Sequence, residues 1–250
     1  MNNKSQIMVD DIVVNYYKNN WNSDFVVVLL HWRGRDGLDW KDYFEPLISK
    51  WISFVAIDFP WFWYTPMPKT TRWVPEYSEF ILKFLNKIWT TQKIICVWHS
   101  FGGRIWFYLA ANYPDICTKL ILLAPWGVEN SEASTKKSFI KIAKKIAMLP
   151  WLQTIWEHIK NKIGSADYKN AWKMKDIFVK IVNQDLRHLF AKITIPVILY
   201  RWDQDNQILE RQINVIQNLV HDLKVHIYPG VSHDIHKEKV ADILVELTSL

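Results

Sequence analysis

Short apolar runs recur along the chain, each followed by polar residues and then by a helical pattern. The runs do not alternate between apolar and polar positions, which is typical of strands buried on both faces of a parallel sheet. They predict strands at 25–30, 53–57, 94–97, 120–124, 196–200 and 224–228. Helical periodicity between them predicts helices at 43–50, 76–88, 102–112 and 209–220. This alternation indicates an α/β fold with a mostly parallel wound sheet flanked by helices, and 7–17 suggests an antiparallel pair at the sheet edge.

One long interval departs from that alternation. No strand pattern occurs between residues 123 and 197, whereas 139–147 carries an apolar stripe with lysines on the opposite side, and Pro150 ends that helical pattern. We predict that residues 127–195 form a helical cap insertion over the carboxyl edge of the sheet. Residues 1–126 and 196–250 would then form the core domain.

Length and composition narrow the class of protein. The 250 residues, half of them hydrophobic, suit one large α/β domain with an insertion. The first residues lack the apolar segment of a secretory signal, and no run is long and apolar enough for a membrane span, so we expect a cytoplasmic protein without stable membrane insertion. Cys96 and Cys117 give neither a disulfide framework nor a metal pattern.

The net charge of +6 is unevenly distributed. Residues 131–196 carry 13 Lys plus Arg against 5 Asp plus Glu, so the rest of the chain is slightly acidic. A basic surface attracts anionic substrates or acidic lipid, although a solvated lysine-rich face is the simpler interpretation. No nucleic-acid motif accompanies the charge, so we expect no nucleic-acid partner.

The residues that suggest chemistry begin with the run Ile-Ile-Cys-Val-Trp-His-Ser-Phe-Gly-Gly at 94–103. A buried strand here leads into Ser100 and then into a helix. The run resembles the nucleophile elbow of the α/β-hydrolase family, pattern G-x-S-x-G, in which a strained turn projects the serine above the sheet. Gly102 fits the second glycine, whereas Trp98 stands where the first is expected.

Two further segments resemble parts of the same family. The turn Leu-Leu-His-Trp-Arg-Gly at 29–34 is similar to its H-G-x-G turn, which implies an oxyanion hole formed by the backbone N–H groups of Arg33 and Phe101. By this resemblance His31 is a hydrogen-bonded turn residue. The segment 200–208 resembles the W-G-x-x-D turn, which places the triad acid at Asp205 in preference to Asp203.

The last segment completes the resemblance. Tyr-Pro-Gly-Val-Ser-His-Asp-Ile-His at 228–236 resembles the family's histidine loop, which implies that His233 is the catalytic base and His236 a structural neighbour. The order serine, acid, histidine is that of the family. The segment 58–65, which follows a predicted strand, resembles the family's D-x-P-G-x-G loop, and by this resemblance Asp58 organises a turn. The resemblance implies a serine hydrolase of a small ester, thioester, lactone or carbon–carbon substrate, with no metal or cofactor.

Tryptophan stands in glycine positions of the elbow, of the turns at 29–34 and 200–208, and of the loop that follows Asp58. The chain has 15 Trp and only 7 Gly, where average usage would give roughly 17 glycines. Glycine slots of the family hold Trp at 32, 61, 63, 98 and 202, and turns at 21, 51 and 89 hold it too. We hypothesise that the source organism reads the codon UGA as glycine. Translation of its gene with a genetic code that reads UGA as tryptophan would then give the sequence shown.

The altered glycines keep two other functional readings open. One is a catalytically impaired α/β-hydrolase-like binding protein, because bulky residues oppose the backbone conformations that glycine permits. The other is a membrane-surface protein that uses the basic cap. The sequence does not specify the substrate or the oligomeric state.

Overall fold

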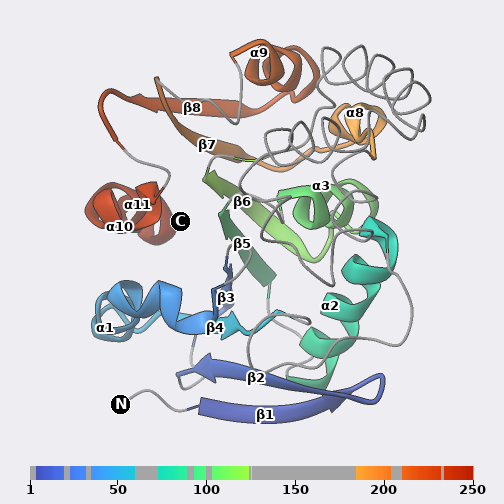
Figure 1. The fold of residues 1–250 in the computed structure, drawn as a ribbon, viewed down its shortest axis with the longest axis vertical. Helices are drawn as coiled ribbons and strands as arrows, with labels where there is room; N and C mark the ends of the chain where they lie inside the picture. The colour runs from blue at the N-terminus through green and yellow to red at the C-terminus, as the bar shows by residue number, and fades with distance from the viewer. Residues whose placement is uncertain are drawn as a thin grey trace, which may run out of the picture. The chain divides into compact units, whose positions relative to one another are not determined.

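The fold is built on one eight-stranded sheet, seen in a computed structural model (Figure 1). The structure describes residues 4–19, 23–31, 35–59, 73–88, 93–99, 103–123, 125, 184–203, 210–231 and 234–249. The strand order is β1-β2-β4-β3-β5-β6-β7-β8. The strands are β1 (Lys4–Val9), β2 (Ile12–Lys18), β3 (Phe25–Leu30), β4 (Ser53–Ile57), β5 (Lys93–His99), β6 (Cys117–Leu123), β7 (Val197–Trp202) and β8 (Leu223–Tyr228).

Strand direction follows the predicted pattern. β1 pairs with β2 and β2 with β4 in antiparallel fashion, and every pair from β4 through β8 is parallel. All five residues of β4 are buried, as are five of six in β3 and six of seven in β5. This burial explains the unalternating apolar runs, because these central strands are covered on both faces. The predicted α/β fold class is confirmed.

Helices cover both faces of the sheet. Figure 1 shows α1 and α11 on one side and α2 and α3 on the other, in agreement with the contacts between α1 and α11 and between α2 and α3. The helices are η1 (Gly37–Trp40, a 3-10 turn), α1 (Lys41–Ser49), α2 (Val74–Ile88), α3 (Gly103–Asn112), α8 (Arg187–Phe190), α9 (Glu210–Leu219), α10 (Ile235–Glu238) and α11 (Val240–Thr248).

Two units divide the chain by its internal contacts. One comprises Met1–Val128 with Asp185–Leu250, and the other comprises Glu129–Gln184. The predicted cap, 127–195, lies mostly outside the described residues, so it stays a prediction. Its described end includes α8, which contacts α3 and α9 and belongs to the unit that holds the sheet.

The end of α1 has a geometry that normally calls for glycine. The N–H of Ile52 donates to the carbonyl of Leu47 at 2.9 Å, and the N–H of Trp51 donates to that of Ile48 at 3.0 Å. This pair of bonds is the Schellman motif, whose first residue beyond the cap adopts a left-handed conformation. That residue here is Trp51, with φ of 58° and a side chain 80% exposed. A tryptophan thus occupies a glycine conformation and gains little burial in exchange.

The two cysteines lie side by side on neighbouring strands. The sulfur atoms of Cys96 in β5 and Cys117 in β6 are 2.8 Å apart, and both are free thiols. Burial raises the pKa of Cys96 well above its usual value, and the neighbouring thiol raises it further. Cys96 is therefore a small, neutral core residue, as the sequence predicts.

No helix in the described part of the chain combines the length and the apolar character that crossing a membrane requires.

Candidate active site

The carboxyl ends of three parallel strands lead to the predicted catalytic triad. β5 ends at His99, immediately before Ser100, while β7 and β8 end ahead of Asp205 and His233. The side chains of Ser100, Asp205 and His233, and the N–H groups of Arg33 and Phe101, lie outside the described residues. The site is therefore built from the residues that flank these positions.

His31 fixes the turn that follows β3. Its side chain is 1% exposed, and its Nε2 accepts a hydrogen bond of 2.9 Å from the N–H of Phe59. A ring nitrogen that accepts carries no proton, so the neutral imidazole holds its proton on Nδ1. The bond joins the end of β3 to the end of β4, and the sequence prediction of a turn histidine is confirmed.

Asp58 organises the neighbouring turn. Its Oδ1 accepts a hydrogen bond of 2.7 Å from the N–H of Gly37. A Cβ atom at Gly37 would lie 2.8 Å from the Tyr17 ring and 3.1 Å from Asp58 Oδ1, so only glycine permits this approach. Burial, helped by Asp36, raises the pKa of Asp58 to about 6, against the lowering effect of the Gly37 N–H. The predicted role of turn organiser is confirmed.

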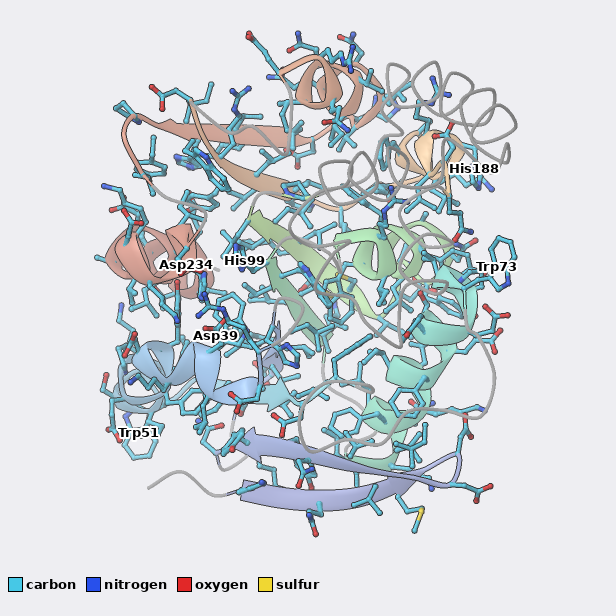
Figure 2. All side chains as sticks on the ribbon, in the orientation of Figure 1. Asp39, Trp51, Trp73, His99, His188 and Asp234 are labelled. Carbon is cyan, nitrogen blue, oxygen red and sulfur yellow. The ribbon has the colours of Figure 1, made fainter. Side chains whose placement is uncertain are left out.

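A group of charged and imidazole side chains lies beside these turns; we call it the carboxyl-edge cluster. Figure 2 shows three of its members, Asp39, His99 and Asp234, near one another. They come from η1, from the end of β5 and from the segment before α10. The full cluster is Arg35, Asp39, His99, Asp234, His236 and Lys237.

Asp39 lies at the centre of the cluster. Its Oδ2 is 3.0 Å from Nε2 of His236, and its Oδ1 is 2.8 Å from Lys237 Nζ and 2.9 Å from Arg35 Nη1. Burial opposes ionisation of Asp39, but His236, Lys237 and Arg35 outweigh it and hold the pKa of this carboxyl well below its usual range. Asp39 is therefore an anion throughout the neutral range.

Arg35 and His236 extend the cluster to two further segments. Nη2 of Arg35 lies 2.8 Å from each carboxylate oxygen of Asp234. The rings of His236 and His99 lie 4.4 Å apart between centroids, and both side chains are fully buried. The segment after β8 is thereby tied to the turn after β3 and to the end of β5.

The cluster also has the residue types of a metal site. Candidate ligand atoms of Asp39, His99 and His236 lie within 4.8 Å of one another. Two cations, Arg35 and Lys237, already contact Asp39 at 2.9 and 2.8 Å. They compensate the only carboxylate of the three and would repel a divalent ion nearby. The arrangement favours a charged structural cluster over a metal centre.

Asp203, the alternative to Asp205 as triad acid, has a structural contact at the end of β7. Its Oδ1 accepts a hydrogen bond of 3.2 Å from the N–H of Gly230, and its own N–H donates to Tyr228 at 3.3 Å. Gly230 has φ of 69°, a conformation that favours glycine. Asp203 thus joins the ends of β7 and β8.

Sequence reasoning missed Arg35 and Asp39. Their signal is weak, because an arginine and an aspartate four residues apart are common on exposed helix surfaces. The resemblance predicts a structural role for His236, and this side chain has buried contacts with Asp39 and His99.

A match to a known protein family shows which family the chain belongs to. Residues 65–240 match the family model described as "Serine aminopeptidase, S33". The chain belongs to this α/β-hydrolase family. The matched range includes positions 100, 205 and 233, which the sequence assigns to the triad.

Solved structures of other hydrolases share the fold. A membrane phospholipase A described as a bacterial virulence factor has a TM-score of 0.75 and 19% identity, over 99% of this chain and 85% of that one. A hydrolase from Pseudomonas aeruginosa PA01 has a TM-score of 0.74 and 15% identity, over 99% and 97% of the two chains. The TM-scores show a common fold, and at identities this low the similarity shows the fold alone.

One curated relative is similar over a short segment. The 1-acylglycerol-3-phosphate O-acyltransferase ICT1 of Saccharomyces cerevisiae is 58% identical over 40 residues. The matched segment is 16% of this chain and only 10% of the yeast protein.

Proposed function

We propose that the chain is a serine hydrolase that cleaves a small ester, thioester, lactone or carbon–carbon substrate through an acyl-enzyme. Ser100 is the nucleophile, His233 the general base and Asp205 the acid that orients it. The N–H groups of Arg33 and Phe101 form the oxyanion hole.

The observation that carries the proposal is the contact between His99 and His236, whose ring centroids lie 4.4 Å apart. His99 directly precedes Ser100, and His236 follows His233 by three residues. Contact between these two neighbours supports convergence of the serine and histidine loops at one sheet edge. Active sites of open α/β sheets lie at the carboxyl ends of the strands.

The reaction follows from the roles of these groups. His233 takes the proton from Ser100 as the serine oxygen bonds to the substrate carbonyl carbon, and the negative charge on the carbonyl oxygen is met by two N–H donors. The protonated histidine then donates to the leaving group, and an acyl-serine remains. Water, deprotonated by His233, then attacks this ester. The acid is released as the protonated His233 returns its proton to the oxygen of Ser100.

The relatives support acyl chemistry but not one substrate. One similar protein is a phospholipase A and another is a 1-acylglycerol-3-phosphate O-acyltransferase, and both names refer to acyl esters. The alternative, a catalytically impaired binding protein, is favoured by Trp98. This side chain is 1% exposed near the end of β5, and its buried indole N–H has no hydrogen-bond partner among the residues that the structure describes.

The decisive experiment treats two versions of the purified chain with a fluorophosphonate probe. One is the printed sequence, and the other carries glycine at positions 32, 61, 63, 98 and 202. We expect labelling of Ser100 and turnover of p-nitrophenyl esters, at least in the glycine version, and loss of both in Ser100→Ala. Absence of labelling in both folded versions would overturn the hydrolase proposal and favour the binding protein.

A further inference from the structure

The carboxyl-edge cluster joins three segments that each continue directly into the proposed active site. Arg35 follows Arg33 by two residues, His99 precedes Ser100, and Asp234 follows His233. Consecutive Cα atoms are about 3.8 Å apart. Fixing His99 and Asp234 therefore restricts the positions that Ser100 and His233 can occupy.

One carboxylate connects all three segments. Asp39 contacts His236 at 3.0 Å, and the His236 ring packs on His99. Asp39 also contacts Arg35 at 2.9 Å, and Arg35 contacts both carboxylate oxygens of Asp234 at 2.8 Å. Removal of Asp39 would break the side-chain path from His99 to Arg35, while the backbone pairing of β3 with β5 would remain.

Stability alone gives a poor account of this arrangement. Two acids, Asp39 and Asp234, balance two bases, Arg35 and Lys237, and Asp39 is held at 2% side-chain exposure. Apolar side chains of similar volume usually stabilise a buried site at least as well as such ion pairs do. A charged cluster at this edge is better explained by the short contacts that it makes between separate segments.

We propose that Asp39 is a positioning residue of the hydrolase reaction. It acts through His236 to hold the end of β5, and through Arg35 to hold the segment that carries His233. This inference rests on the proposed function. Catalytic groups must be held within about 0.5 Å of their productive geometry, so a loosened cluster lowers kcat more than it raises KM.

The test compares Asp39→Asn with Asp39→Glu in the version of the full chain that the fluorophosphonate probe labels. Asparagine keeps an oxygen for Lys237 but presents an amide N–H₂ or a neutral oxygen to His236, whereas glutamate restores the charge. We expect Asp39→Asn to lower kcat and the labelling rate by roughly 10- to 100-fold, with little change in KM. Asp39→Glu should recover part of the loss.

Two other variants separate positioning from folding. Lys119→Met removes a buried cation near the start of β6, where Lys119 donates to the carbonyls of Glu246 and Ser249 at 3.1 and 2.7 Å. It should lower the unfolding midpoint and leave kcat unchanged. Asp234→Asn alters a side chain that is 37% exposed, so it should fold and show a smaller fall in kcat.

All rates are measured well below the unfolding midpoint of each variant. If the parent is labelled but Asp39→Asn and Asp234→Asn both keep the parental kcat, the inference is wrong. The proposed function is not affected by that result. If Asp39→Asn does not fold, Asp234→Asn decides by the same criterion. If neither version of the parent is labelled, the proposed function and the inference fail together.

Discussion

Trp51 is the residue at which sequence and backbone disagree most. It takes φ of 58° in the Schellman motif after α1 and leaves its side chain 80% exposed (Figure 2). A left-handed conformation costs a non-glycine residue about 1 kcal/mol or more. We therefore expect Trp51→Gly to be more stable than Trp51→Ala by about 1 kcal/mol in urea denaturation. Ala is the matched comparison because both variants lose the indole, and equal stability would contradict this reading.

The same position tests the decoding hypothesis. If UGA encodes glycine in the source organism, the native protein carries glycine at 51, where the backbone requires it, and at 98, which the family's elbow assigns to glycine. Mass spectrometry of peptides from the native protein distinguishes the two residues directly. Tryptophan at both positions would end the hypothesis and leave the strain at Trp51 as a real cost.

Asp58 should give stability an unusual dependence on pH. Its folded pKa of about 6 lies above the ordinary value of 3.8 because burial disfavours the charged form. The stabilising effect of the protonated form is thus complete below about pH 4 and lost as pH rises through 6. A shift of two units corresponds to about 3 kcal/mol at most.

Asp58→Asn removes this titration and keeps an oxygen for the N–H of Gly37. Relative to the parent, the variant should gain stability between pH 4 and pH 7.5, by at most about 3 kcal/mol. Urea denaturation at both pH values measures the change. If parent and variant differ in stability by the same amount at pH 4 and at pH 7.5, Asp58 does not titrate in this range.

At the scale of elements, the sequence predicts those strands and helices whose positions are set by burial of apolar side chains. The predicted strands at 25–30 and 53–57 match β3 and β4, because unbroken apolar runs mark strands covered on both faces. It missed η1 and the short helix α10, whose four residues are too few for a helical period to stand out. It also missed α11, a nine-residue helix near the end of the chain. The pairing of Asp39 with His236, 197 positions along the chain, leaves no local pattern.

Tyr43 tests how α1 and α10 support each other. Its hydroxyl donates a hydrogen bond of 2.6 Å to the carbonyl of His236, and burial raises its pKa well above 10, so it remains a donor. Tyr43→Phe leaves that carbonyl without its partner and should lower the free energy of unfolding by about 1 kcal/mol. Tyr113→Phe, in a ring 36% exposed, is the control and should have no effect. Equal stability of both variants would show that the bond contributes nothing.

At the scale of the whole molecule, charge separates the two parts of the sequence. Residues 131–196 hold 13 of the 31 basic residues and 5 of the 25 acidic ones. Such a field attracts anions over roughly the Debye length, about 8 Å at physiological ionic strength. If the proposed hydrolase acts on an anionic acyl group, kcat/KM should fall several-fold as salt is raised, while a neutral ester of the same size should show no change.

A variant with glutamine at Lys141, Lys144 and Lys145 makes this expectation specific. It removes three charges from the lysine-rich side of one predicted helix. The salt dependence for the anionic ester should weaken, and the rate for the neutral ester should remain, because charge steers association and not the chemical step. Unchanged salt dependence would mean that these lysines only solvate the surface. Sedimentation with anionic but not neutral vesicles, lost in the same variant, would instead indicate that the basic region meets a membrane surface.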